Sequence, residues 1–271
     1  MSTRPARPGL RFAPGNHTYR LDGQRVPGVT TILGILDKPA IPKWAARVVA
    51  EYVADNTDAL EHLRAMGRGP MVDALRSLPW QRRDEAADRG TTIHDFAERI
   101  VNGEDVEIDD NDPLLPVVEN AIAFMEDWQI EPVLVEQSVA SREHQWAGRL
   151  DLGARYVRPD TGHRGLGIFD WKSGKALYPE YAWQLNAYAH AEFYGEDGDE
   201  HPMPEFDAAF GVQIRADGYD VAPFAFGPHI YDEFLLIRRT YDVVKAGRGD
   251  WKRPGSGHVG LTIQTEPRSA A

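Results

Sequence analysis

The pattern of apolar and polar residues changes about halfway along the chain. Up to about residue 128, apolar residues recur at intervals of three and four, which is typical of amphipathic helices. From residue 132 onward, short apolar or alternating runs predominate, which is typical of strands. The sequence therefore predicts an α/β or α+β protein with a central mixed sheet flanked by helices and a helical N-terminal region before it.

Turn and cap signals divide the two halves further. Asp22-Gly23 predicts a hairpin within 16–27. The expected helices cover 31–38, 43–54, one or two short segments in 57–79, then 80–101, 113–128, 179–194 and 228–244. The expected strands cover 132–140, 146–157, 166–171, 206–214 and 219–226. The predicted organisation is a flexible arm over 1–15, a mainly helical region over 16–128, a core over 129–246 and a loose tail over 247–271.

Composition narrows the class of protein. Of 271 residues, 42% are hydrophobic and 27% charged, as in ordinary globular proteins. The sequence contains neither an apolar run of about 18 residues nor a secretory signal, so we expect a cytoplasmic protein with no membrane partner. The absence of cysteine excludes disulfides, thiolate zinc sites, iron–sulfur clusters and a cysteine nucleophile.

The net charge of −12 argues at first against a nucleic-acid partner. The acids are segregated, however. Residues 104–136 contain 11 acidic and no basic residues, and 192–220 carry a net charge of −8, so the rest of the chain carries +7. The segment 142–175 contains seven basic and four acidic residues. We take Arg142, Arg149 and Lys175 from this segment as candidate DNA contacts.

The strongest chemical signal is a set of charged residues on two adjacent predicted strands. Residues two apart in a strand share a face, so Asp170 and Lys172 should point the same way and Trp171 into the opposite layer. Pairing of the strands can bring Asp151 beside Asp170, which makes an oxygen cage suited to Mg²⁺ or Mn²⁺. The alternative is a partly buried ion pair, Asp170 with Lys172 or Asp151 with Arg149.

Three further features could belong to the same site. His94 and Glu98 are four apart on one predicted helix, and an imidazole is a good ligand for Mn²⁺. Gln184 and Tyr188 share a face of another helix, and Glu136 lies on the strand before Asp151. Taken singly, these features are more typical of a structural or surface histidine, an ordinary amphipathic helix with a buried tyrosine, and a solvated glutamate.

Together these stretches resemble the PD-(D/E)XK nuclease superfamily, and specifically the phage-encoded, cluster-free members of its RecB-like exonuclease branch. That branch carries G-x-x-H, G-x-x-D, D/E-x-K and Q-x-x-x-Y in this order. The matching segments here are 90–94 (one residue longer than the usual spacing), 148–151, 170–172 and 184–188. The resemblance spans about residues 89–194 and implies a restriction-endonuclease-like core.

The resemblance also implies roles for individual residues. Metal ligands would be His94, Asp151, Asp170 and the backbone carbonyl of Trp171. Lys172 would be the catalytic lysine, with Gln184 and Tyr188 positioning the nucleic acid or the site. Glu136, and Glu98 beside His94, are possible additional acids. Many RecB-like members hold an iron–sulfur cluster with four cysteines, which this chain lacks.

The function expected from this resemblance is a divalent-metal-dependent DNA exonuclease acting in phage recombination, replication or repair. Its location would be the cytoplasm of the host cell, and its partners DNA and a recombinase or single-strand annealing protein. Two alternatives remain open: a nuclease-fold protein that binds DNA or a partner without cleavage, and a structure-specific endonuclease. Metal-free hydrolysis by paired carboxylates would leave His94 and Lys172 unexplained.

Overall fold

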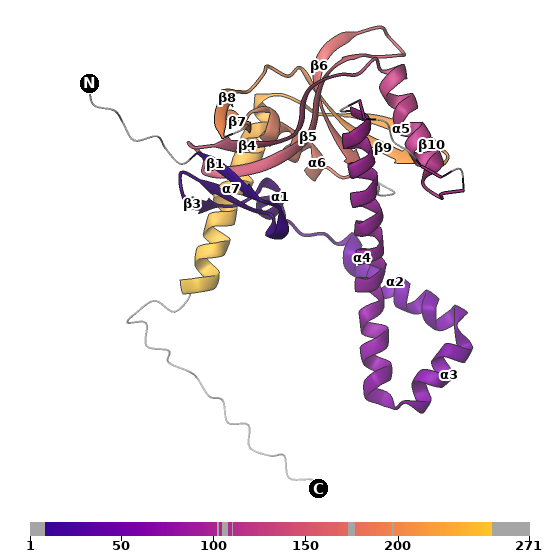
Figure 1. The fold of residues 1–271 in the computed structure, drawn as a ribbon. Coiled ribbons are helices and arrows are strands. Elements are labelled where there is room, and N and C mark those ends of the chain that lie inside the picture. The colour runs from indigo at the N-terminus through magenta and orange to yellow at the C-terminus, as the bar shows by residue number, and fades with distance from the viewer. Residues whose placement is uncertain are drawn as a thin grey trace, which may run out of the picture.

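A mixed sheet of seven strands forms the centre of the described part of the chain, and helices lie on both of its faces (Figure 1). The computed structural model describes residues 9–101, 103–104, 108–109, 111–172, 177–196 and 198–250, without the side chains of 86–94, 97, 100 and 248–250. The strands, in sheet order, are β10 (Gly218–Phe224), β9 (Ala208–Arg215), β6 (Arg164–Lys172), β5 (Trp146–Val157), β4 (Glu131–Ser141), β7 (Phe193–Glu196) and β8 (Asp199–Pro202). The predicted α/β class with a mixed sheet is confirmed.

The order of the strands follows from short connections and one crossover. Strands β4, β5 and β6 are consecutive antiparallel neighbours. The chain then passes through helix α6 (Glu180–Ala189) and the β7–β8 hairpin before β9 pairs with β6 in parallel. Strand β10 closes this edge as an antiparallel hairpin with β9. The crossover places α6 against the face of β6 that carries Asp170.

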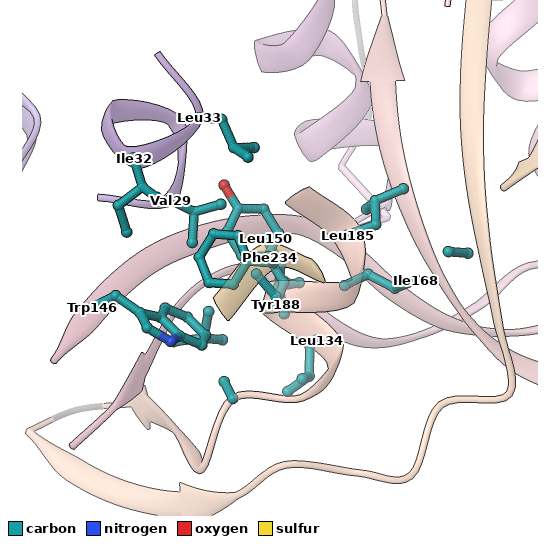
Figure 2. Packing of buried hydrophobic residues seen from close by; sticks show 14 residues of the cluster. Val29, Ile32, Leu33, Leu134, Trp146, Leu150, Ile168, Leu185, Tyr188 and Phe234 are labelled. Carbon is teal, nitrogen blue, oxygen red and sulfur yellow. The ribbon is translucent and has the colours of Figure 1, made fainter. Parts of the chain in front are cut away.

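Two hydrophobic clusters hold the layers together, one on each face of the sheet. On one face, Leu150 and Ile168 pack with Leu185 of α6, with helix α1 (Val29–Leu33) and with Phe234 of helix α7 (Pro228–Asp250), as Figure 2 shows. On the other face, Phe124 of helix α5 (Leu115–Asp127) packs edge-on to Trp171, with ring centroids 5.6 Å apart. Large aromatic side chains of this kind bury 150–250 Å² each and supply much of the hydrophobic stabilisation.

A smaller sheet at the N-terminus packs against the large one. It consists of β1 (Leu10–Ala13), β2 (Thr18–Leu21) and β3 (Gln24–Val26), with a short 3-10 helix, η1 (Pro14–Asn16), after β1. Tyr19 and Leu21 pack with Ala140, Ala147 and Phe193 of the main sheet. The hairpin at Asp22-Gly23 is confirmed, but residues 10–13 form a strand where the sequence predicted a flexible arm.

The helical region departs from the sequence prediction at its prolines. Helices α2 (Ala40–Asp55) and α3 (Thr57–Ala65) agree with it, whereas helix α4 (Arg68–Val101) runs through Pro79 without interruption. Pro70 lies in the first turn, where a missing N–H costs nothing. Beyond Pro79, α4 reaches the large sheet and contacts α5 and β4, while α2, α3 and the first part of α4 project away from it (Figure 1). These tertiary contacts outweigh the local penalty.

The segment after α6 also differs from the prediction. The sequence predicted a helix up to residue 194, but α6 ends at Ala189 and residues 193–196 form β7. Glu192 N–H donates to the carbonyl of Ala140 (3.0 Å), and Phe193 pairs with Ala140 in the sheet. Hydrogen bonds to the open edge of β4 therefore replace helical ones. No helix among the described residues is long and apolar enough to cross a membrane.

Candidate active site

One cavity of about 580 Å³ collects most of the residues that the motifs singled out. Its wall combines β4, β5 and β6 of the large sheet with α4, α6 and the N-terminal sheet. The acidic residues in the wall are Asp95, Glu98, Glu136, Asp151 and Asp170. Arg149, Lys172, Gln184 and Tyr188 face the same cavity. Residues from four of the predicted motif segments or their immediate neighbours therefore meet at one place.

The two aspartates lie on adjacent strands, as the sequence predicted. Strand β5 pairs with β6 up to Leu152↔Phe169, and the next position of this register sets Asp151 opposite Asp170. Asp151 Oδ2 accepts a hydrogen bond from the Trp171 N–H (3.0 Å), which ties the carboxylate to the neighbouring strand.

Alternation along β6 places the catalytic candidates on one face. Trp171 packs in the cluster around Phe124, whereas Ile168 packs in the opposite cluster with α6. Asp170 is only 2% exposed, and Lys172 is half-buried on the same side as Asp170. The prediction that Asp170 and Lys172 share a face and Trp171 enters the opposite layer is confirmed.

The Lys172 ammonium forms an ion pair with Asp170 Oδ2 and lies 4.3 Å from the centre of the Tyr181 ring. Burial works to lower the pKa of Lys172, but Asp170 and Asp151 together raise it above its ordinary value. Lys172 is therefore a cation at neutral pH. Its charge is available to stabilise negative charge that develops in the cavity.

Asp151 behaves differently because it lies deep among other acids. Burial, the charge of Asp170 and the charge of Glu136 raise its pKa well above the usual range for aspartate, in that order. Lys172 and the Trp171 N–H oppose this effect without cancelling it. A carboxylate that is costly to ionise is stabilised by any cation that enters the cavity.

Helix α6 supplies two side chains that brace the acids. Gln184 Nε2 donates to Asp170 Oδ1 (3.1 Å) and lies 3.4 Å from the Tyr188 hydroxyl. Tyr188 is almost fully buried, and burial, Tyr19 and Asp170 raise the pKa of its phenol well above the ordinary value. Tyr188 therefore remains a neutral phenol, and Gln184, which lies between Tyr188 and Asp170, holds Asp170 by its hydrogen bond.

Glu136 and Arg149 form a pair at the edge of this group. Arg149 Nε donates to Glu136 Oε2 (2.5 Å), and its guanidinium lies 5.4 Å from the ring centre of Phe12. Glu136 has a φ of 50°, a conformation that costs a non-glycine residue about 1 kcal/mol or more. Burial is the largest cause of its raised pKa, which the nearby Arg149 only partly offsets.

Glu136, the residue with the strained backbone, lies beside a break in the alternation of side chains along β5. Leu150 and Leu152 are two apart in β5 but pack in clusters on opposite faces of the sheet. The register of β4 and β5 sets Glu136 opposite Asp151, between these two leucines. The irregular backbone at Glu136 thus accompanies the local rotation of β5 at Asp151, and strain of this kind is common at functional sites.

Helix α4 brings its acids to the cavity. Asp95 and Glu98 line it, and the charges of Glu98 and Asp95 both raise the pKa of Glu136. The backbone of His94 directly precedes Asp95 in the helix, while its side chain lies outside the described residues. Glu98 thus lies at the cavity, while its role as an additional acid and the role of His94 as a ligand stay predictions.

The candidate DNA contacts separate. Arg149 lines the cavity, and Lys175 lies outside the described residues. Arg142 is not among the residues that line the cavity. Its guanidinium forms ion pairs with Asp22 (2.8 Å) and Glu200 (2.5 Å) and lies 4.5 Å from the ring centre of Phe193. Two carboxylates therefore already pair with Arg142, which gives it a structural role in the fold, while the predicted DNA contact stays a prediction.

The donor chemistry of the cavity fits a hard divalent cation. Asp170 Oδ2 is buried and is paired with the Lys172 ammonium. Asp151 lies opposite, and carboxylate oxygens are the ligands that Mg²⁺ and Mn²⁺ prefer. The described residues nevertheless hold no group of three acids or histidines arranged to bind an ion. Any third side-chain ligand would come from elsewhere or require a rearrangement.

Several residues of the cavity gave no signal in the sequence. Phe12, Pro14, His17, Tyr19 and Thr30 come from the N-terminal sheet, η1 and α1. Phe12 stacks on Tyr19, with centroids 4.9 Å apart, and meets His17 edge-on. These residues lie more than 100 positions before Asp151 and outside the four segments 90–94, 148–151, 170–172 and 184–188, so the tertiary fold was needed to bring them to the site.

Comparison of the sequence with models of known protein families and with curated proteins finds no match.

Proposed function

We propose that this protein is a divalent-metal-dependent DNA nuclease of the PD-(D/E)XK type with a restriction-endonuclease-like core. The observation that carries the proposal is the convergence of Asp151, Asp170 and Lys172 in one cavity, from two adjacent strands. The resemblance depended only on the order of four short motifs in the sequence. A nuclease site also requires that the motif residues lie close together in space, and a chance match of motifs would not be expected to satisfy that second requirement.

Two aspartates and two neighbouring groups would hold the metal in this proposal. Asp151 and Asp170, with the Trp171 carbonyl and His94, would hold the metal. When bound, the metal supplies Lewis acidity and a more acidic water. Gln184 fixes Oδ1 of Asp170 through the 3.1 Å hydrogen bond, while Oδ2 is ion-paired with Lys172, so a metal would share Oδ2 with the ammonium or displace it. The site therefore presents one carboxylate already oriented and a second that a cation would help to ionise.

Lys172 acts by charge in this proposal. Phosphodiester hydrolysis builds negative charge on the phosphate oxygens, and a fixed cation aimed at them lowers the barrier. The raised pKa of Lys172 keeps it protonated, so it is a poor general base at neutral pH and a good electrostatic stabiliser. The Tyr181 ring beside the ammonium restricts where the charge can lie.

The finer assignments extend the same proposal. Exonuclease action of the RecB-like type, and a role in phage recombination, replication or repair with a recombinase or annealing partner, follow from the motif order alone. The N-terminal sheet contributes Phe12 and Tyr19 to one wall of the cavity that holds Asp151 and Asp170. A closed circular DNA substrate separates exonuclease from endonuclease action, because an exonuclease leaves a circle intact.

The decisive experiment measures DNA degradation by purified protein with Mg²⁺ or Mn²⁺ and with EDTA. Linear DNA should be degraded only with metal, and Asp151→Asn and Asp170→Asn should each lose about 10²-fold or more in rate. Asp160→Asn is the matched control, because Asp160 is an exposed acid in the β5–β6 turn paired with Arg158. Full metal-dependent activity in both site variants would overturn the proposal.

A further inference from the structure

A second cavity, of about 280 Å³, lies between the N-terminal sheet, α1 and α7. Its wall carries Arg25 of β3 and Lys245 of α7, together with His17 and Thr31. None of the described residues that line it is acidic. We call this cavity the phosphate pocket, since its charge is opposite to that of the catalytic cavity.

The two cavities adjoin. His17 lines both of them. Chain neighbours also divide between them at two places: Thr18 lines the phosphate pocket and Tyr19 the catalytic cavity, while Thr31 lines the first and Thr30 the second. The turn at η1 and β2 and the start of α1 are thus the partition between the cavities.

The basic groups of the phosphate pocket are available to a ligand. Arg25 and Lys245 are exposed, and neither forms an ion pair with a carboxylate in the part of the chain that the structure describes. Lys245 Nζ lies 5.5 Å from the Tyr241 ring centre, an arrangement that holds the ammonium at the pocket. Arg238 lies on the same ring but is paired with Asp242 (2.5 Å).

The charge of the catalytic cavity, the one that holds Asp151, Asp170 and Lys172, explains why basic groups beside it would be required for DNA binding. Five acids line it, while its Arg149 is paired with Glu136 and its Lys172 with Asp170. A polyanion entering this cavity therefore meets net negative charge. Phosphate-binding cations must lie beside the cavity if a DNA strand is to stay bound there, since phosphate contacts supply most of the sequence-independent affinity.

We propose that the phosphate pocket binds a backbone phosphate of the DNA strand whose neighbouring phosphodiester is cut in the catalytic cavity. This inference rests on the proposed nuclease function. It assigns the strand a direction across the protein, from the catalytic cavity over His17 to Arg25 and Lys245. The N-terminal sheet and α7, which contain none of the nuclease motifs, thereby become part of the substrate site.

The test is binding of a fluorescein-labelled single-stranded oligonucleotide in EDTA over a series of NaCl concentrations. The double variant Arg25→Ala/Lys245→Ala should bind about tenfold more weakly at physiological salt. The slope of log affinity against log salt should fall by about 0.7, the value for one neutralised phosphate on a single strand. The reverse exchange, Arg25→Lys/Lys245→Arg, keeps both charges and should bind within about twofold of the natural protein, because phosphate contact is largely electrostatic.

The matched control is Lys43→Ala/Arg64→Ala, which removes two exposed charges from α2 and α3. These helices project away from the sheet (Figure 1), so the control should bind nearly as well as the natural protein. Equal losses in the two double variants would show a general charge effect and overturn the inference. In cleavage assays, the pocket variant should raise KM about tenfold and leave kcat nearly unchanged.

The outcomes separate the two proposals. If the natural protein cuts no DNA with any divalent metal but loses binding in the pocket variant, the nuclease proposal fails and the phosphate pocket stands as a DNA-binding site. If the natural protein cuts DNA and the pocket variant matches the control in affinity and KM, the pocket inference fails while the nuclease proposal stands.

Discussion

Gly148 lies directly against the ring of Tyr188. A Cβ atom on Gly148 would overlap Cε1 of Tyr188 and lie 3.0 Å from its Cδ1. The glycine of the G-x-x-D segment and the tyrosine of the Q-x-x-x-Y segment thus form one contact between β5 and α6. This contact seats α6 close enough for Gln184 to reach Asp170.

Substitution of Gly148 by alanine should therefore be destabilising. We expect a loss of about 1–3 kcal/mol in the free energy of unfolding, because an added methyl group in a packed interior forces shifts of side chain or backbone. Urea unfolding followed by circular dichroism measures it. In Gly148→Ala/Tyr188→Ala, the alanine at 148 should add almost nothing to the cost of Tyr188→Ala alone. Gly69→Ala in α4, where a Cβ would meet nothing, is the control and should not destabilise.

Asp151→Asn should stabilise the metal-free protein while it lowers the cleavage rate about 10²-fold or more. The folded-state pKa of Asp151 is raised, so its contribution to stability is fully present below the unfolded-state pKa and is lost as pH rises through the folded value. Asparagine cannot ionise, so the variant does not lose stability as the pH rises through the folded-state pKa of Asp151. Its melting temperature should exceed that of the natural protein at pH 8 by about 2–4 °C per kcal/mol relieved, and the gap should narrow toward pH 4. A gap that is constant with pH would contradict the pKa assignment.

Metal addition should act on the same acids. Mn²⁺ or Mg²⁺ should raise the melting temperature of the natural protein at pH 8, and less so near pH 5, because protonated carboxyl groups are poor ligands. Asp151→Asn and Asp170→Asn should lose most of this rise, whereas Asp160→Asn should keep it. Thermal shift assays in EDTA and in metal measure the difference. Equal shifts in all three variants would place the ion elsewhere.

The pH dependence of cleavage should distinguish a charged Lys172 from a neutral one. We expect the rate to increase from acid pH as Asp151 ionises and then to stay flat to about pH 9, since the pKa of Lys172 lies above its ordinary value of about 10.4. Lys172→Met should lose about 10²-fold or more in kcat. A falling limb below pH 9 that disappears in Lys172→Arg would show that lysine deprotonation limits the natural enzyme.

Arg142→Ala should affect stability and leave DNA binding unchanged. Its two ion pairs join the β4–β5 turn to Asp22 and to Glu200 of β8, and their loss should cost about 1–2 kcal/mol in unfolding free energy. The slope of DNA affinity against salt should stay within error of the natural protein. A reduced slope would show Arg142 to be a phosphate contact.

Local pattern determined much of this protein. The period of two along 166–171 sufficed to place Asp170 and Lys172 together and Trp171 apart, because alternation is a property of any strand. Likewise, strand β5 coincides with the predicted range 146–157. The tertiary structure alone decided what depends on distant contacts: the continuity of α4 through Pro79, the strand β7 on the edge of β4, and the aromatic wall from β1 and β2. In each case, hydrogen bonds or packing between segments far apart in the chain outweighed the local preference, and no local pattern records such contacts.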